Sequence, residues 1–600
     1  MNSITGKILT VDLDKDLIRT QVTPKEWIEL YTGQKGLATR LLMESLDPTV
    51  DPLSPENKLV LATSIMAGTI VSCSAKLAVA AKSPQTGTIS DGSVGGHIGS
   101  ELKYAGYDAV TLTGKAKRLC YLYIDPDRVE IRDAEDLKGV GAFEAEARIK
   151  EKVGDGQVKV LTIGPAGENL VRYSCICSER YRQLGRGGLG AVMGSKNLKA
   201  IAIRGWLDIQ VADIEKCMAV AAEAHKYDGI LEPDFDMYEY GTPVLVDMAQ
   251  ESGLLPTHNF QTGRFEGSKN INGETLKGLR KNKKACFSCG IACGNYVQAD
   301  ESAVEGPEFE TIALCGSNIG NSDPKLLIEL NSLCDDLGLD TISTGGVLAC
   351  MMEMTERAIY DFGIRFGDTA KAIELVHDIA GLQGIGKEAA LGAKALAKKY
   401  GAPELAMQIK GMELPGYDPR GSWAMGLAYA TAPRGGCHMT TYPIAEEAWG
   451  DLDPFTFEGK AKLVAEGQNS QFTKFSMGIC DFWPISSATL GSLFEATYGG
   501  SWPEEKVDLT GERIFNLQRM FNIMAGFNRK DDRLPDRFYT ETLPAGPPKG
   551  IEMPEQAFNT TLEEYYSLRG WDEQGRPTVE TLTRLGIEKE LIDRYRKSLD

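Results

Sequence analysis

CFSCGIACG, residues 286–294, holds three cysteines in the spacing Cys-x2-Cys-x3-Cys. Iron–sulfur clusters and structural zinc sites usually take four protein ligands, so this stretch cannot close either kind of site alone. A zinc site typically shows a second Cys or Cys/His pair soon afterwards, whereas Cys315, Cys334 and Cys350 stand singly. The spacing therefore favours an iron–sulfur cluster whose fourth ligand lies far along the chain. Zinc and buried structural thiols are the alternatives, and spacing alone does not choose the fourth ligand.

The composition around this motif limits the partners and the location that we expect. The formal net charge is −19, and the short basic run at 280–284 lies just before the cysteines. This balance argues against nucleic acid or a membrane surface as the main partner. The first residues show no secretory signal and no apolar stretch is long enough to span a bilayer, so we expect a cytoplasmic protein. Cysteine usage there favours metal or redox chemistry over disulfides, and five histidines are too few for a site built mainly of imidazoles.

The hydrophobic pattern predicts an α+β protein with several domains, because a chain of 600 residues is too long for one core. Residues 1–206 alternate as β-strands, with a hairpin turn at 125–127, and carry glycine-rich loops. From 207 to 410 the spacing is mainly helical, with helices predicted over 326–338 and 387–401 that end at glycine. The stretch 411–421 is a seam, and 411–600 forms a third, mainly helical domain.

Several long stretches occur in the order found in a known family. The chain resembles the tungsten-containing aldehyde:ferredoxin oxidoreductases along essentially its whole length. The matching stretches are DPTVDPLSPENKL (47–59), GPAGENLVRY (164–173), GRGGLGAVMGSKNLKAIA (185–202), CFSCGIACG (286–294), EGPEFE (305–310), CDDLGLDTISTGG (334–346), ELPGYDPRG (413–421), RGGCH (434–438) and YYSLRGW (565–571). The resemblance implies that the β-rich domain is the base for a bis-pterin cofactor and that two mainly helical domains follow it.

The resemblance also supplies the missing cluster ligand. In that family the fourth cysteine lies in a distant loop, which corresponds here to Cys480 in FSMGIC. It implies that a [4Fe–4S] cluster is held by Cys286, Cys289, Cys293 and Cys480. It further implies one tungsten held by two pterins, with Mg²⁺ bridging the pterin phosphates. We expect loss of the cluster to loosen the fold, because the cluster ties two domains together.

The cofactor contacts follow by the same resemblance, position by position. The residues expected to contact the pterins or the Mg²⁺ are Lys76, Ser93, Gly95, Arg182, Gln183, Gly185, Arg186, Asp335, Leu339, Asp340, Arg434 and Ile479. The glycines suit this task because backbone N–H groups must approach phosphates closely. The arginines of the GRGG region would add charge-assisted bonds to phosphate.

This chain departs from the family pattern at several of these positions. In the family two loops hold the pterins, and the first of them is intact here at Asp335–Asp340. Phe475 stands where the second loop has an aspartate, and an apolar ring cannot accept the pterin N–H bonds. Lys76 replaces an arginine and keeps the charge without the planar fork. Ser93 replaces an asparagine whose backbone oxygen reaches the Mg²⁺, and Gln183 occupies the other such position. Both residues keep a backbone oxygen, so this ligation tolerates the changes. Some relatives carry Glu-x-x-His for an iron at the dimer interface. Here Glu329 is present, but Ser332 stands in the position of the histidine, so we expect any oligomer to lack that iron.

Oxidation of an aldehyde needs a proton acceptor near the metal and a donor that polarises the carbonyl. The resemblance assigns these tasks to Glu310 in EGPEFE and His438 in RGGCH, with Glu305 and Glu308 as close rivals of Glu310. A Cys437–His438 nucleophile is disfavoured, since adjacent residues of a strand point to opposite faces.

The resulting hypothesis is a tungsten oxidoreductase that converts aldehydes to carboxylic acids. Electrons would pass through the [4Fe–4S] cluster to ferredoxin or an Fe–S partner subunit, docked near the basic run at 280–284. A tungsten subunit that reduces rings or acyl-CoA, and a non-catalytic Fe–S electron-transfer subunit, are the alternatives. The sequence leaves open the aldehyde, tungsten against molybdenum, the electron acceptor, the oligomeric state and the consequence of Phe475.

Overall fold

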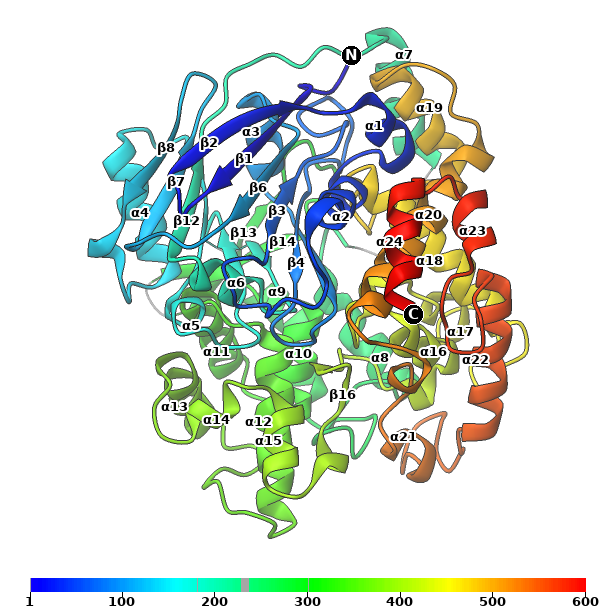
Figure 1. Cartoon of the computed structure of the whole chain (residues 1–600). Helices are drawn as coiled ribbons and strands as arrows, with labels where there is room; N and C mark the ends of the chain where they lie inside the picture. The colour runs from blue at the N-terminus through cyan, green and yellow to red at the C-terminus, as the bar shows by residue number, and fades with distance from the viewer. Residues whose placement is uncertain (1, 181, 228–236, 300–301, 600) are drawn as a thin grey trace.

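A computed structural model describes residues 2–180, 182–227, 237–299 and 302–599. The N-terminal part holds two six-stranded sheets (Figure 1). The first has the order β2-β1-β6-β3-β4-β5, from strands β1 (Lys7–Asp12), β2 (Leu17–Val22), β3 (Leu59–Ala62), β4 (Leu77–Lys82), β5 (Ile89–Val94) and β6 (Ala109–Thr113). The second has the order β11-β10-β9-β12-β7-β8, from β7 (Cys120–Ile124), β8 (Val129–Asp133), β9 (Lys159–Thr162), β10 (Ile176–Ser178), β11 (Arg182–Leu184) and β12 (Leu198–Ile203).

The two sheets pack face to face. Leu9 and Val11 of β1 share one hydrophobic core with Leu122 of β7 and Ile201 of β12. Strands β7 and β8 pair antiparallel around the expected turn at 125–127. The side chains of β4 are buried all along the strand, because helices cover the other face of its sheet. The sheet-rich first part that the alternating pattern predicted is therefore present.

The described residues of this first part form the helices α1 (Lys25–Tyr31), α2 (Gln34–Ser45), α3 (Ile98–Tyr104), α4 (Ala142–Val153), α5 (Pro165–Glu168) and α6 (Leu189–Ser195). Helix α2 lies between the first sheet and the long C-terminal helix α20 (Glu504–Met524). Gly36 makes this approach possible, since a Cβ there would lie 2.7 Å from Cδ1 of Ile514. Helices from both ends of the chain therefore cover the first sheet, whose strand β5 carries Ser93, one of the expected cofactor contacts.

The middle part is mainly helical, as predicted. Its helices are α7 (Ile214–Tyr227), α8 (Leu245–Ser252), α9 (Gly273–Gly278), α10 (Phe309–Cys315), α11 (Pro324–Leu337), α12 (Thr341–Glu356), α13 (Thr369–Gly381), α14 (Gly386–Ala389) and α15 (Ala393–Lys399). Asp323 caps α11 through the N–H groups of Lys325 and Leu326, and Gly338 ends it at φ 77°. The helix predicted over 387–401 is instead two helices, because Gly392 adopts φ 90° between them.

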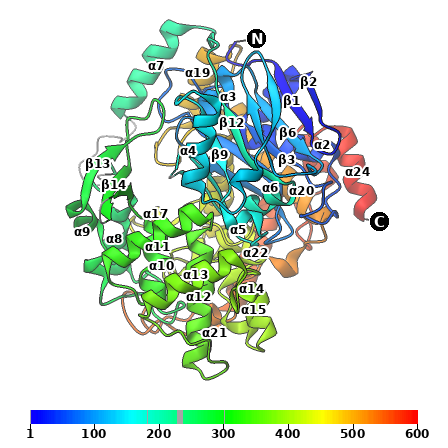
Figure 2. The ribbon, with the colours of Figure 1, turned by 90° about the vertical axis from the view of Figure 1, so that its left-hand side faces the viewer.

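The middle part also contains a small sheet that the sequence did not predict. Strands β13 (Arg280–Lys284), β14 (Gly294–Ala299) and β15 (Ser302–Glu305) form an antiparallel sheet, and the basic run is its first strand. The cysteine motif is the loop between β13 and β14. In Figure 2 this sheet lies on the opposite side of the molecule from β1 and β2. A short hairpin, β16 (Gln408–Ile409) and β17 (Met412–Glu413), lies at the predicted seam.

The C-terminal part is helical and lies against both earlier parts. Its helices are α16 (Trp423–Thr431), α17 (Ile444–Glu447), α18 (Lys460–Ser476), α19 (Ser487–Thr497), α20, α21 (Arg537–Thr540), α22 (Glu555–Arg569), α23 (Val579–Arg584) and α24 (Lys589–Leu599). Helix α18 packs on α20 and α2, and α19 packs on α7 (Figure 1). Buried Asp532 pairs with Arg519 at 2.7 Å and with Lys410 at 2.8 Å, which joins this part to the hairpin. No helix within the described residues is long and apolar enough to cross a membrane.

Candidate functional site

The four predicted cluster cysteines come from two segments that the fold brings together. Cys286, Cys289 and Cys293 lie between β13 and β14, and Cys480 follows α18 after Gly478, which adopts φ 84°. The pKa of the Cys293 thiol is raised well above its usual value by burial, with Glu308 and then Cys480 adding to the effect. The pKa of Cys286 is raised by burial, and Cys480 and Cys289 act on it in the same direction. The thiols of the two segments therefore lie close enough to influence one another's pKa.

The donor set of this site suits an iron–sulfur cluster. Within the described ranges, no group of three or more His, Cys, Asp or Glu side chains is close enough to hold one metal ion. Cysteine thiolates are the usual ligands of iron–sulfur clusters, four for each [4Fe–4S] cluster. Gly95 leaves room for the loop, since a Cβ there would lie 2.8 Å from Cys286 Sγ. The four cysteines are therefore the kind and number of ligands that such a cluster takes.

Two predicted cofactor contacts carry positive charge next to these thiols. The pKa of Lys76 is raised against the effect of its burial, chiefly by Cys480 and Asp481. Arg182 forms an ion pair with Glu305 at 2.7 Å, and its pKa is raised by Glu305 and Cys286 despite burial. Nε and Nη2 of Arg182 are buried, and no described residue forms a hydrogen bond with either atom. Such unpaired donors fit an anionic group, because a buried polar atom without a partner is costly.

The first predicted pterin loop connects α11 to α12. Asp340 accepts a hydrogen bond from the N–H of Ser343 at 3.1 Å and so caps α12, while Gly185 lies beside its carboxylate. Burial raises the pKa of Asp335 well above its usual value. Leu339 is buried and bridges to Ser174 of the N-terminal part. The helix end at glycine that the sequence predicted is present at Gly338, and the cofactor contact of this loop stays a prediction.

Arg186 has a structural role that sequence reasoning missed. It adopts φ 70° and is buried. Its guanidinium donates to the carbonyls of Gly436, at 2.6 Å, and Glu413, and lies 3.4 Å from the Asp340 carboxylate. The side chain therefore joins the GRGG loop to the hairpin, to the RGGCH loop and to α12.

The second predicted pterin loop is lined by an apolar ring and positive charges. Phe475 is buried, and the amines of Lys35 and Lys76 lie 5.4 and 5.9 Å from its ring centre. Lys35 pairs at 2.6 Å with Asp91, a buried carboxylate on β5 that sequence reasoning missed. Arg434 donates to the carbonyl of Asp91 at 2.5 Å.

The remaining cofactor candidates occupy the same region. The hydroxyl of Ser93 on β5 accepts from Gln34 at 2.8 Å. The side-chain oxygen of Gln183 on β11 accepts from the thiol of Cys175 at 3.1 Å. Ile479 is fully buried directly before Cys480. Strands β5 and β11 contact each other, so both predicted backbone ligands of the magnesium lie at adjoining strands.

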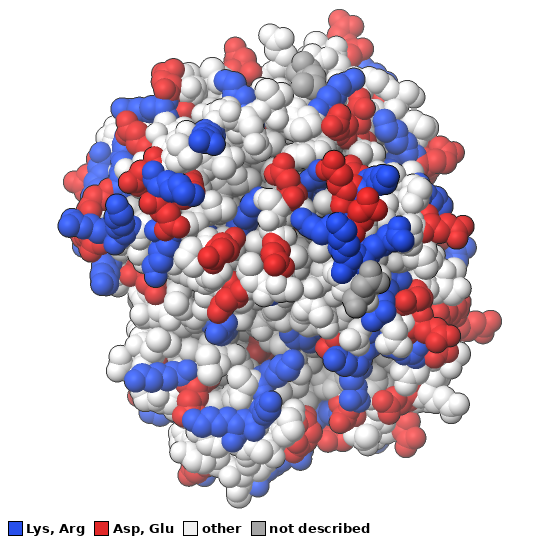
Figure 3. All heavy atoms as spheres, viewed as in Figure 1, with Lys and Arg blue, Asp and Glu red and all other residues white. Residues whose placement is uncertain are grey.

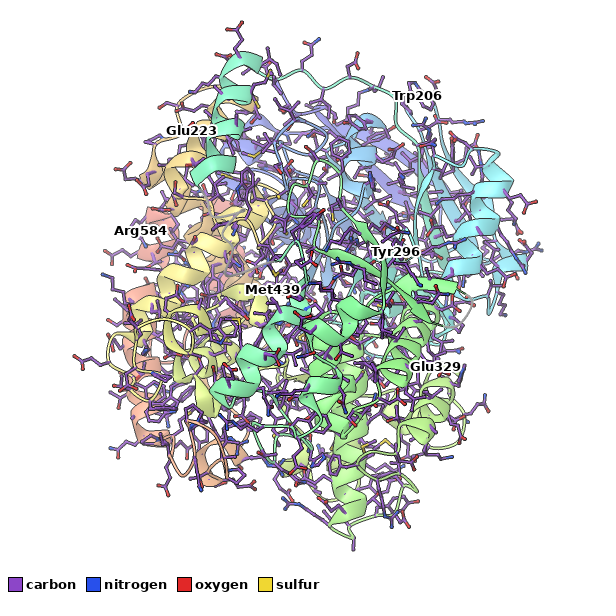
Figure 4. The ribbon with its side chains drawn as sticks, turned by 180° about the vertical axis from the view of Figure 1, so that it is seen from behind. Trp206, Glu223, Tyr296, Glu329, Met439 and Arg584 are labelled. Carbon is purple, nitrogen blue, oxygen red and sulfur yellow. The ribbon has the colours of Figure 1, made fainter. Side chains whose placement is uncertain are left out.

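Glu310 and His438 face each other, as the catalytic assignment requires. Glu310 lies in the first turn of α10 and accepts the N–H of Gly416 at 2.8 Å. Its Oε1 lies 3.6 Å from Nδ1 of His438, too far for a hydrogen bond. Both atoms are buried without a hydrogen-bond partner among the residues that the structure describes. Figure 4 shows the neighbouring Met439 near the middle of the molecule, below the sheet that carries Tyr296.

Burial sets the charge of both groups. It raises the pKa of Glu310 to about 7, against the hydrogen bond from Gly416 that lowers it. It lowers the pKa of His438 to about 3, with Arg186 and Arg434 acting in the same direction. Near neutral pH the imidazole is therefore neutral, while the carboxyl group can exist with or without its proton.

Aromatic side chains surround this pair. Tyr417 stacks on Phe309 with ring centres 4.6 Å apart and lies edge-on to His438 at 6.4 Å. The Tyr442 hydroxyl donates to that of Tyr417 at 2.5 Å. Trp449 contacts both tyrosines, at 6.3 and 5.8 Å between ring centres. Sequence reasoning did not select these residues, although ELPGYDPRG contains Tyr417.

The rivals of this pair have other partners. Glu308 accepts from the hydroxyl of Thr242, and Glu305 is paired with Arg182. The Cys437 sulfur accepts from Nε of Arg434 at 2.9 Å and from the N–H of Met439. His438 begins a 3-10 turn and not a strand. These contacts leave Glu310 as the carboxylate that faces the histidine.

Two family profiles match the chain. The N-terminal domain of aldehyde ferredoxin oxidoreductase matches residues 8–205, and domains 2 and 3 of the same family match residues 220–587.

Among curated proteins, the tungsten-containing aldehyde ferredoxin oxidoreductase of Pyrococcus furiosus is 41% identical over 97% of this chain and 98% of its own length. The protein of that name in Thermococcus kodakarensis is 40% identical, over 97% of this chain and 98% of its own length. The WOR-like subunit of aliphatic sulfonate oxidoreductase from Pyrococcus furiosus is 30% identical and covers both chains fully. Among solved structures, the active site complex BamBC of benzoyl coenzyme A reductase aligns with a TM-score of 0.87 at 26% identity, over 99% of both chains.

Proposed function

The chain is an oxidoreductase of the aldehyde ferredoxin oxidoreductase family, and we propose that it oxidises aldehydes to carboxylic acids. The observation that carries this proposal is the buried pair of Glu310 Oε1 and His438 Nδ1, which lie 3.6 Å apart and have no hydrogen-bond partner within the described part of the chain. Aldehyde, water and the product acid all offer oxygen atoms that such a pair binds. The surrounding rings of Tyr417, Tyr442 and Trp449 would exclude bulk water from the reaction.

The net reaction joins an aldehyde and water into a carboxylic acid and releases two protons and two electrons. A tungsten bis-pterin centre, when bound, accepts the two electrons. The Glu310 carboxylate takes a proton from water as the new C–O bond forms, a task for which its pKa of about 7 is suited. The neutral His438 carries one N–H donor, which orients and polarises the aldehyde oxygen.

Three cofactors are proposed for this chain. They are the tungsten that the relatives' names give, held by two pterins, a [4Fe–4S] cluster and Mg²⁺. Cys286, Cys289, Cys293 and Cys480 would hold the [4Fe–4S] cluster, and the proximity of their thiols supports this. The two loops at Asp335–Asp340 and 475–480, with Lys76, Arg182 and Arg434, would hold the pterins. The backbone oxygens of Ser93 and Gln183 would bind Mg²⁺.

Electrons would leave through the cluster to a ferredoxin or an Fe–S partner subunit. Ser288 and Gly290 of the cysteine loop are exposed, so the cluster would lie close to the surface. Lys281 on β13 is exposed nearby and would attract an acidic partner. The face shown in Figure 3 mixes both signs of charge and shows no broad basic patch for nucleic acid. Cytoplasmic location and an oligomer without interface iron stay predictions from the sequence.

A second candidate function is reduction of the ring or of the acyl group of an acyl-coenzyme A substrate. The observations that favour it are the structural likeness to the benzoyl coenzyme A reductase complex and the apolar Phe475 in the second pterin loop. The higher identity to the aldehyde enzymes, 41% against 26%, favours the aldehyde reaction.

The test begins with metal content and turnover of anaerobically purified protein. We expect tungsten and iron, at about four irons per chain, and dye reduction that depends on aldehyde. The Glu310→Gln variant should keep both metals and lose the activity. Glu446→Gln is the matched control, because Glu446 is exposed on α17 in the segment after His438. Metal-loaded protein that reduces no dye with any aldehyde, but reacts with a ring acyl-CoA, would overturn the proposal.

A further inference from the structure

A fifth cysteine lies among the predicted cluster ligands. Cys73 belongs to the loop between β3 and β4 and is 3% exposed. Its Sγ lies 3.6 Å from Sγ of Cys289, within the range of a sulfur hydrogen bond. Neither the spacing of the cysteine motif nor the resemblance assigns this thiol a task.

The backbone of Cys73 is bonded to both ligand segments. Its N–H donates to the carbonyl of Ser288 at 3.1 Å, and its carbonyl accepts from the N–H of Cys480 at 2.8 Å. The preceding residue, Ser72, accepts from the N–H of Gly290 at 3.2 Å. The position of the sulfur is therefore fixed by the same two segments that would hold the cluster.

The backbone conformation at this position is unusual. Cys73 adopts φ 57°, a left-handed conformation that costs free energy for a residue with a Cβ. Surrounding contacts must hold a residue in such a conformation, and here they include the bonds to Ser288 and Cys480. The strained residue is thus found where the two cluster segments meet.

The Cys73 thiol has two possible hydrogen-bond partners, the hydroxyl of Ser72 and the sulfur of Cys289. The hydroxyl of Ser72 lies 3.5 Å from Cys73 Sγ, and Cys289 Sγ lies 3.6 Å from the same atom. A protonated Cys73 can accept from Ser72 and donate its S–H to Cys289. A cluster uses four cysteines, so the fifth stays free to act as this donor.

We propose that Cys73 donates an S–H···S hydrogen bond to the cluster-ligating sulfur of Cys289 and thereby raises the reduction potential of the [4Fe–4S] cluster. Hydrogen bonds to ligand sulfurs stabilise the reduced cluster, which carries one more negative charge. Cys73 is then a positioning and tuning residue and not a ligand. The inference rests on the cluster of the proposed function, but not on the aldehyde reaction.

The test compares Cys73→Ala and Cys73→Ser with the wild-type enzyme in redox titrations monitored by electron paramagnetic resonance. We expect all three proteins to hold about four irons. Cys73→Ala should lower the midpoint potential, by about 59 mV if the reduction equilibrium constant changes tenfold. Cys73→Ser, which keeps an O–H donor, should lie between the other two. Cys217→Ala, a change of a buried cysteine on α7, should leave the potential unchanged.

Two results would overturn the inference. One is a full iron content with unchanged potential in both Cys73 variants. The other is loss of iron in Cys73→Ala but not in Cys289→Ala, which would make Cys73 the ligand. An unchanged potential with intact aldehyde oxidation contradicts this inference alone. A shifted potential in an enzyme that oxidises no aldehyde contradicts only the proposed reaction.

Discussion

Glu310 Oε1 and His438 Nδ1 lie 3.6 Å apart, and both are buried with no hydrogen-bond partner in the described ranges of the chain. Unpaired buried polar atoms cost free energy, so a fold retains them where a ligand or a reaction uses them. The pair joins the start of α10 to the RGGCH loop, which lie far apart in the sequence.

Replacing Glu310 by glutamine should lower kcat by about 10²- to 10⁴-fold, because the amide cannot accept the proton of water. The wild-type rate should rise with pH through about 7, where the carboxyl group loses its proton. Steady-state kinetics from pH 5.5 to 8.5 check this, with Glu446→Gln as the control. A variant that keeps the wild-type rate and pH profile would remove Glu310 from the reaction.

The same substitution should stabilise the fold at high pH. The pKa of Glu310 is about 7 in the folded protein, against an ordinary value of 4.5 for a glutamate exposed to water. At pH values between the two, folding therefore takes up a proton. Wild-type stability therefore falls as the pH rises through this window, by up to about 3 kcal/mol above pH 7. Glu310→Gln should unfold at a higher temperature than wild type at pH 8, with a smaller difference at pH 5.5. Equal gains at both values would show that burial does not shift this group.

Replacing Cys480 by serine should remove the cluster and loosen the contact between the middle and C-terminal parts. Iron per chain should fall, and the melting temperature should fall with it, because metal binding is coupled to folding. Cys217→Ala is the control for loss of a cysteine away from the cluster. Equal melting temperatures with and without the cluster would show that the cluster does not tie the two parts together.

Asp532→Asn should destabilise the protein without changing the metal content. The pKa of Asp532 is held at about 2 by Arg519 and Lys410, against complete burial. Removing one partner of a buried ion pair leaves uncompensated charge and costs about 3–5 kcal/mol. Thermal unfolding near neutral pH measures the loss, and Asp536→Asn, at an exposed residue of the same segment, is the control. An unchanged melting temperature for Asp532→Asn would contradict this account.

Much of the fold could be predicted because its patterns are local. The alternation of Leu9 and Val11, the turn at 125–127 and the glycine after α11 each report the backbone directly. The family matches confirm the resemblance and the family's α+β fold. The strand β13 was missed because RKNKK has no apolar alternation to mark it. The break at Gly392 was missed because a single glycine is tolerated inside a helix.

Only the part of the candidate site that leaves a local pattern in the sequence could be predicted from the residues alone. Spacing identified three cysteines, while Cys480 and the Glu310–His438 pair came only from the resemblance, since no local pattern links distant loops. Asp91 and Cys73 were missed because a single acidic residue or thiol carries no spacing signal. Their partners become visible only when the chain is folded.

The most direct test of the central claim is the stoichiometry of turnover under anaerobic conditions. Tungsten-loaded protein is mixed with one aldehyde and an excess of a one-electron acceptor, and the carboxylic acid and the reduced acceptor are both counted. The account predicts one acid for every two acceptor molecules reduced, and loss of both products in Glu310→Gln. Acceptor reduction without acid, or no reduction by any aldehyde in fully metallated protein, would contradict it.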